Sequence, residues 1–116
     1  MTYRVRRGSD LLIAHVEEAS SPLARMRGLL GEPGLPPYRG LHLVPCTALH
    51  TCFMRFTIDA FFLDREHVVV RAVRRIRPFR FVPGGGGARS AVEVASGWLP
   101  AEAVKVGDRL VFEPVD

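Results

Sequence analysis

The residues best equipped for chemistry lie in one stretch, from Pro45 to Asp59, which contains a histidine, an arginine, an aspartate and two cysteines. Alternate side chains of an extended strand point to opposite faces. If the stretch is extended, one face carries Cys46, His50, Cys52 and Met54, and the other carries Thr51, Arg55 and Asp59. Each face predicts a different chemistry.

The first face carries soft ligand atoms. Thiolate, imidazole and thioether groups together suit Cu(I) or Zn(II), but buried cysteine and methionine are also ordinary core residues. We expect core packing, with no metal and no cofactor. A straight strand would separate Cys46 from Cys52 by about 20 Å, whereas a disulfide requires Cα atoms within about 7 Å. Both cysteines are therefore expected to be reduced thiols.

The second face predicts a polar binding site. Its residues would be Arg55 and Asp59, with His50 at the rim, Glu93 from a distant strand and Arg27 from the end of a predicted helix. Such a set could grip a carboxylate, phosphate or sugar, or perform general acid–base catalysis. Alternatively the charges pair with one another and the histidine bonds the backbone. We favour a non-catalytic domain that binds a small ligand or a protein; the alternative is a small hydrolase or transferase using the same residues.

Sequence motifs leave the question of catalysis open. The chain contains no serine-nucleophile motif, P-loop or His-Glu-x-x-His sequence. Arg55 and Asp59 would lie about 13 Å apart on a straight strand, too far to pair. Glu93 is the expected partner of Arg55, because a lone carboxylate in an apolar strand is costly unless it is paired or exposed. We expect a structural role for Glu93 and a functional one for His50 and Asp59.

A second candidate surface is the segment from Arg71 to Phe81, which interleaves arginines with phenylalanines. Single-stranded nucleic acid is bound by this combination, through phosphates and stacked bases. A strand with one solvated face would look the same. The chain carries a net charge of +4, but five of its positive charges lie in this segment, and the eleven basic and twelve acidic residues elsewhere give a net charge of −1. Nucleic acid is therefore an unlikely partner, and we expect at most weak, salt-sensitive binding.

The elements that position these residues are mostly strands. Turn signals and alternation predict an opening hairpin, Tyr3 to Arg7 with Leu11 to Glu17, and a second hairpin, Ala60 to Leu63 with His67 to Val73, at the centre of the sheet. Further strands are predicted at 41–44, 91–95 and 110–113, with one helical turn at 99–104. Helical spacing after a Ser-Pro start predicts a short helix from Ser21 to Leu30. Pro83 to Gly87 should form a flexible link.

Length and composition are those of one domain over residues 1–116. The chain is 47% hydrophobic, which is enough for one packed core. It has no apolar run of the roughly 18 residues that span a bilayer and no signal-peptide core. We therefore expect a cytoplasmic protein that does not bind membranes.

Several runs of sequence resemble one family. They are Ser21-Pro22-Leu23 leading to Gly31, the run His-Thr-x-x-Met-Arg-x-x-Ile-Asp-x-x-Phe-Leu-Asp from His50 to Asp64, and Glu93-x-x-x-Gly97 followed by Gly107-Asp108. Together they resemble domain of unknown function 192, also called UPF 0127, a family of uncharacterised bacterial and archaeal proteins. The resemblance covers roughly Ser20 to Leu110. It implies a compact, mainly β (α+β) domain, β-barrel-like or β-clip-like, with one short helix in its N-terminal half. The tetraglycine after Pro83 departs from that pattern.

Overall fold

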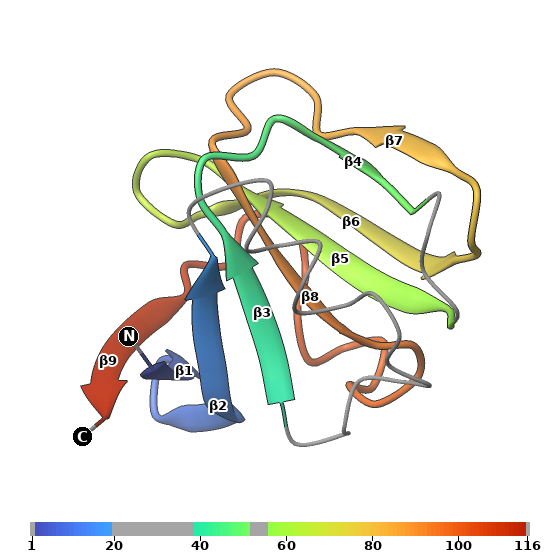
Figure 1. Cartoon of the computed structure of the whole chain (residues 1–116). Coiled ribbons are helices and arrows are strands. Elements are labelled where there is room, and N and C mark those ends of the chain that lie inside the picture. The colour runs from blue at the N-terminus through green and yellow to red at the C-terminus, as the bar shows by residue number, and fades with distance from the viewer. Residues whose placement is uncertain (1, 20–38, 52–55, 116) are drawn as a thin grey trace.

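The computed structural model describes residues 2–19, 39–51 and 56–115, and the regular structure of this part of the chain is β-strand. The strands are β1 (Thr2–Arg7), β2 (Asp10–Ala19), β3 (Arg39–Leu43), β4 (Ala48–His50), β5 (Ile58–Leu63), β6 (Val69–Ile76), β7 (Phe81–Pro83), β8 (Ser90–Ala95) and β9 (Val111–Val115) (Figure 1). The mainly β fold is therefore confirmed. The helix expected from Ser21 to Leu30 lies outside the described residues. No described segment forms a helix long and apolar enough to cross a membrane.

Seven strands form one sheet in the order β6-β5-β8-β3-β2-β1-β9. β2 and β3 run parallel, and the other neighbours run antiparallel. Both predicted hairpins are present, as β1 with β2 and β5 with β6. The expectation that the second hairpin is the centre of the sheet is wrong, because β6 is an edge strand and β3 lies in the middle. β8 inserts between β5 and β3, and such long-range pairing leaves no mark in local periodicity.

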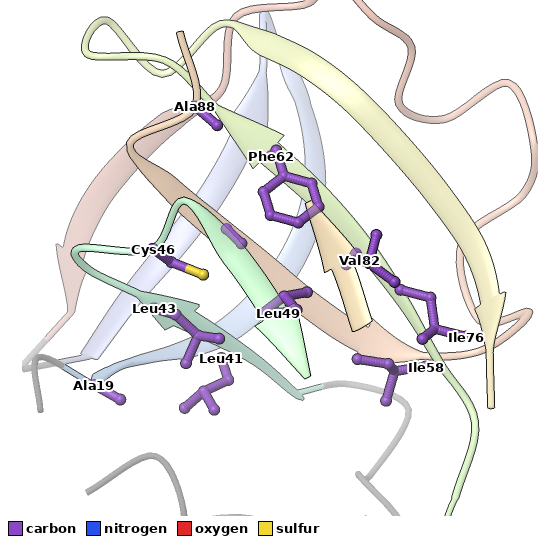
Figure 2. Close-up of a cluster of buried hydrophobic side chains, with 12 residues drawn as sticks. Ala19, Leu41, Leu43, Cys46, Leu49, Ile58, Phe62, Ile76, Val82 and Ala88 are labelled. Carbon is purple, nitrogen blue, oxygen red and sulfur yellow. The ribbon is translucent and has the colours of Figure 1, made fainter. Parts of the chain in front are cut away.

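Both faces of the sheet are covered around β5, which is buried at every position. On one face, Phe62 and Ile58 pack beneath the two-stranded sheet of β4 and β7, which contributes Leu49 and Val82 (Figure 2). The opposite face carries a second cluster, to which Phe61 and strands β1, β2 and β8 contribute. The fold therefore holds two apolar cores, one on each face of β5.

The two ends of the sheet approach one another without closing a barrel. Val68 and Arg109 form an isolated bridge, and Leu110 donates a backbone hydrogen bond to His67 over 2.9 Å. Among the described residues this contact does not extend into a ladder between β6 and β9. The β-barrel-like expectation is therefore corrected to a curved, open sheet, because the contact ends where β9 begins to pair with β1.

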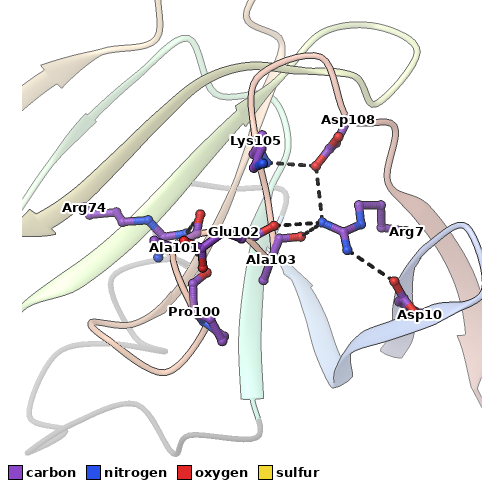
Figure 3. A network of polar contacts seen from close by, with 9 residues as sticks. All are labelled: Arg7, Asp10, Arg74, Pro100, Ala101, Glu102, Ala103, Lys105 and Asp108. Carbon is purple, nitrogen blue, oxygen red and sulfur yellow. Dashed lines mark hydrogen bonds and ion pairs between the residues drawn. The ribbon is translucent and has the colours of Figure 1, made fainter.

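The segment after β8 forms turns where one helical turn was expected. Residues 101–104 are turn or bend, with a backbone hydrogen bond of 3.0 Å from Ala103 to Pro100. Arg74 donates to the Pro100 carbonyl over 3.1 Å, and Arg7 donates to the Glu102 carbonyl over 3.1 Å (Figure 3). Two arginines from different strands thus hydrogen-bond carbonyls of this segment from outside, and the Pro100 carbonyl is closed by a turn bond to Ala103 three residues on.

The tetraglycine has a defined role at its first position. Gly84 is buried, and its amide donates to the Thr47 carbonyl over 2.8 Å. A Cβ at Gly84 would lie 2.5 Å from Phe62 Cδ1 and 2.9 Å from the Thr47 carbonyl oxygen. The absence of a side chain therefore allows β7 to pack against the core.

We expect Gly84→Ala to lower the free energy of unfolding by about 1–3 kcal/mol, the usual cost of overpacking. Gly86→Ala is the matched control, because a Cβ there meets nothing within 4 Å and its φ is not positive. Urea denaturation of both variants measures the difference. Equal stability of the two would show that residues around Gly84 relax freely.

Candidate functional site

Asp59, expected as a ligand-binding residue, lies in a buried polar network on β5. Its side chain is 1% exposed and accepts four hydrogen bonds. The donors are Arg74 Nη1 at 3.2 Å, the Arg75 amide at 2.9 Å, the Ser96 hydroxyl at 3.0 Å and the Gly97 amide at 3.1 Å. Each carboxylate oxygen therefore has two donors, and the burial of the charge is compensated.

This carboxylate also shapes the edge strand beside it. Ile58 pairs with Ile76 and Ala60 with Val73, so two residues of β6, Arg74 and Arg75, oppose the single residue Asp59. Such an arrangement is a β-bulge, which turns a side chain away from the regular alternation. Arg75 has a φ of 58°, an unusual value for a residue with a side chain. The Arg75 amide, displaced from the ladder, bonds to Asp59 instead.

Arg74, inside the bulge, is held on several sides. It pairs with Asp59, donates to the Leu99 carbonyl over 3.0 Å, and lies 5.3 Å from the centre of the Phe61 ring. Cation–π contact and carbonyl bonds both fix a guanidinium in place. Arg74 is therefore a structural arginine, unlike the arginines that follow it.

A groove of about 340 Å³ lies beside the bulge, between β6 and β7. We call it the arginine groove; its lining residues are Val73, Arg74, Arg75, Ile76, Arg77, Arg80, Phe81 and Val82. Arg75, Arg77 and Arg80 are exposed. In the part of the chain that the structure describes, no acidic side chain forms an ion pair with any of these three. Their charges are therefore available to an anion from solution.

Hydrogen bonds to the buried Thr51 fix the loop that carries two of these arginines, Arg77 and Arg80. This fully buried residue donates its hydroxyl to the Arg77 carbonyl over 2.6 Å and accepts from the Arg80 amide over 2.9 Å. Its backbone amide donates to the Arg80 carbonyl over 2.9 Å, and its carbonyl accepts from the Phe79 amide over 3.0 Å. Four bonds from one residue thus preorganise the loop.

His50 lies beside the groove. It pairs with Phe81 across β4 and β7, while the neighbouring pair, Leu49 with Val82, faces the core. Directly paired residues of antiparallel strands point to the same side. His50 is exposed and therefore shares the outer side of this small sheet with Phe81, a groove residue.

The other predicted site residues are divided. Glu93 on β8 is 2% exposed and pairs with Ala60, whereas Asp59 pairs with Val94. Successive residues of a strand alternate in direction, so Glu93 and Asp59 point to opposite faces of the sheet. Arg55 and Arg27 lie outside the described residues, and the pairing of Glu93 with Arg55 stays a prediction.

The soft-ligand set is also divided. The run from Cys46 is not one straight strand, and Cys46 is buried in the core while His50 is exposed. Cys52 and Met54 lie outside the described residues, so the prediction of two thiols stays a prediction. Within residues 2–19, 39–51 and 56–115, no group of three or more His, Cys, Asp or Glu could hold a metal ion.

One titratable residue that we did not single out from the sequence is His42 on β3. It is 3% exposed, and neither ring nitrogen has a hydrogen-bond partner in the described parts of the chain. Its ring stacks on Phe112 with centroids 4.3 Å apart and meets His67 edge-on at 5.6 Å. Burial, and then the neighbouring His67 imidazole, lower the pKa of His42 from 6.5 to about 4. His42 is therefore neutral at pH 7.

Thr51 and the bulge are the parts of the site that sequence reasoning missed. The doubled arginine at 74 and 75 interrupts the alternation of a strand, and such a break is the available signal for a bulge. Thr51 carries no comparable signal, because its partners in the 77–80 loop are far along the chain.

Comparison with known proteins gives a family and a fold. Over residues 4–112 the chain matches the protein-family model described as DUF192: Uncharacterized ACR. A UPF0127 protein of Thermococcus sibiricus is 31% identical over 103 residues, which are 84% of this chain and 66% of that protein. The chain thus spans just under two thirds of the length of this relative.

Two solved structures are similar. A protein of unknown function from Novosphingobium aromaticivorans has a TM-score of 0.80 and 17% identity, over 96% of this chain and 84% of that chain. A Sinorhizobium meliloti protein, provisionally named a transcription regulator, has a TM-score of 0.79 and 20% identity, over 97% and 94% of the two chains. At these identities the likeness shows the fold alone.

Proposed function

The chain belongs to the DUF192 family of uncharacterised proteins, as the resemblance predicted, and from that premise we propose that it is a non-catalytic binding domain whose arginine groove holds an anionic ligand. The family supplies no activity, so the proposal rests on geometry. One observation carries it: Arg75, Arg77 and Arg80 line one groove without an acidic partner among the described residues.

The chemistry of the guanidinium group supports an anion as the ligand. Arginine presents planar, fixed donors that match carboxylate and phosphate oxygens and often bind them in pairs. Like charges placed together repel, and a bound anion would relieve that repulsion. His50 at the rim adds one more donor. The ligand-binding residues we propose are thus His50, Arg75, Arg77 and Arg80, and Asp59 supports them by fixing the bulge.

A second pocket lined by two arginines differs from the arginine groove in its charge balance. Arg65 and Arg89 line a space of about 290 Å³, but Asp64 and Glu66 line it too. The two carboxylates balance the two guanidinium groups. This pocket therefore has much less net positive charge to attract an anion than the arginine groove has.

The positions of the carboxylates support binding over catalysis. Both Asp59 oxygens already have donors, and Glu93 lies on the opposite face of the sheet. A hydrolase or transferase using His50 with these carboxylates, the alternative from the sequence, would need them to converge in one cleft. The expected cytoplasmic location and single-domain organisation stay predictions.

We expect inorganic tripolyphosphate, a probe without any aromatic group, to bind the arginine groove in calorimetric titrations at about 50 mM salt. The double variant Arg77→Gln/Arg80→Gln should weaken binding at least about tenfold, because charge-assisted hydrogen bonds contribute roughly 1.5–3 kcal/mol each. Arg65→Gln/Arg89→Gln is the matched control, since it removes the same net charge. Equal weakening by both variants, or no binding to the wild type, would contradict the proposal.

A further inference from the structure

Two exposed phenylalanines accompany the arginine groove. Phe79 is 72% exposed and Phe81 is 71% exposed, and they flank Arg80. The other large apolar side chains with high exposure in the described residues are aliphatic, namely Leu11, Val106 and Val111. Exposure of an aromatic ring forgoes much of the stabilisation that its burial would give. Two such rings beside unpaired arginines indicate a ligand with flat apolar faces.

We propose that the ligand of the arginine groove is single-stranded nucleic acid, with phosphates on Arg75, Arg77 and Arg80 and bases stacked on Phe79 and Phe81. This inference rests on the proposed anion-binding function and adds the ligand class to it. A simple carboxylate or phosphate would bind the arginines but would make no stacking contact with the two phenylalanine rings. Unpaired bases offer flat π-faces that stack on aromatic side chains without regard to sequence.

An unpaired strand fits better than a duplex. In a double helix the faces of the bases are covered by their stacked neighbours, so the rings could not reach them. Duplex recognition instead uses a helix or a two-stranded ribbon lying in the major groove. The paired part of β4 and β7 is only three residues long on each strand, and Phe79 lies on the loop before it.

Hydrogen bonds fix the backbone that carries these side chains before a ligand arrives. Thr51 makes four hydrogen bonds to the loop, and Asp59 fixes the bulge that precedes it. Phe79 and Arg75 have φ values of 63° and 58°, so both occupy the left-handed region without being glycine. Local strain of this kind is concentrated at binding sites, where preorganisation lowers the entropic cost of binding.

The exposure of these arginines and phenylalanines favours nucleic-acid binding more than the sequence alone did. From the sequence, a strand with one solvated face would show the same interleaved arginines and phenylalanines, and nucleic acid was an unlikely partner. In the structure both rings are exposed; Phe81 lines the groove with Arg75, Arg77 and Arg80, and Phe79 directly precedes Arg80 in the chain. Three phosphate contacts would give an affinity that falls with salt at a log–log slope of about −2, at about 0.7 per phosphate of a single strand.

The test is fluorescence anisotropy with a labelled oligothymidylate of about twelve nucleotides, within the usual range of site sizes. Phe79→Ala and Phe81→Ala should each weaken binding about 5- to 150-fold, the range for one stacked base by alanine substitution. Arg77→Gln/Arg80→Gln should also reduce the salt slope by about 1.4. Val106→Ala, at an exposed apolar residue outside the groove lining, is the control and should change nothing. Thermal melting confirms that each variant is folded.

Two further measurements, with a duplex and with phospholipid vesicles, help to separate the outcomes. A duplex of the same length should bind more weakly than the single strand. If tripolyphosphate binds with the arginine dependence described above while Phe79→Ala and Phe81→Ala leave oligothymidylate binding unchanged, the nucleic-acid inference is overturned and the anion-binding proposal stands. If neither probe binds, both fail. Tighter, phenylalanine-dependent binding to anionic phospholipid vesicles than to oligothymidylate would assign the surface to membranes and overturn the inference.

Discussion

Replacing Asp59 by asparagine is expected to lower the free energy of unfolding by about 3–5 kcal/mol, the loss typical of removing one partner from a buried ion pair. The amide group of asparagine would present a donor where the carboxylate now accepts from two sides. Arg74 would lose its charged partner, and the amide of Arg75 would lose the acceptor that holds the bulge. This expectation reverses the functional role that the sequence suggested for Asp59.

Urea denaturation followed by the fluorescence of Trp98 measures this effect. Glu66→Gln is the control, because it removes an ion pair with Arg109 whose side chains are 71% and 60% exposed. Exposed pairs of this kind contribute at most about 1 kcal/mol. Stability of Asp59→Asn within about 1 kcal/mol of the wild type would show that Asp59 serves the ligand instead of the fold.

The second large effect concerns pH, through His42. The pKa of His42 in the folded protein is about 4, below its ordinary value of 6.5. The unfolded chain therefore takes up a proton at this residue below pH 6.5, while the folded chain does not. The contribution of neutral His42 to the free energy of unfolding is therefore fully present above pH 6.5, and it decreases as the pH falls towards 4. The total loss is about 3 kcal/mol, because one pKa unit corresponds to about 1.4 kcal/mol.

Denaturation midpoints between pH 7 and pH 4 reveal this loss. His42→Phe is the comparison, since a phenyl ring can keep the stack on Phe112 but cannot titrate. The stability of this variant should fall much less over the same range. Asp64 does not account for the loss in this range, because a hydrogen bond from the Val68 amide, the largest cause, holds the pKa of its carboxyl below 3.8. Identical pH profiles for the wild type and His42→Phe would refute the role of His42.

Local signals predicted most of the strands, but not the short strands β4 and β7 or the turns at 101–104, and they did not predict long-range pairing. The turns after Arg7 and after Leu63 encode both hairpins, because a few adjacent residues determine each turn. The place of each strand in the sheet depends on partners far along the chain, as with β8 between β5 and β3. Periodicity contains no information on such partners, so the sheet centre was predicted wrongly.

The site shows the same division between local and distant information. The segment from Arg71 to Phe81 could be identified as a candidate surface, because its interleaved arginines and phenylalanines are close together in the sequence. The bulge at Arg74 and Arg75 requires a carboxylate from β5, and the loop at 77–80 requires Thr51, which is 26 residues from Arg77. Asp59 and Glu93 were predicted to belong to one polar site, but strand register places them on opposite faces of the sheet.

The most direct test of the anion-binding groove is a map of amide chemical shifts in ¹⁵N–¹H spectra as tripolyphosphate is added to the wild-type protein. The backbone amides of Arg75, Arg77, Arg80 and Phe81 should shift most and saturate together. The amides of Arg65 and Arg89, beside two carboxylates, should shift little. Shifts spread evenly over the basic residues, or largest at Arg65 and Arg89, would contradict a binding site in the arginine groove.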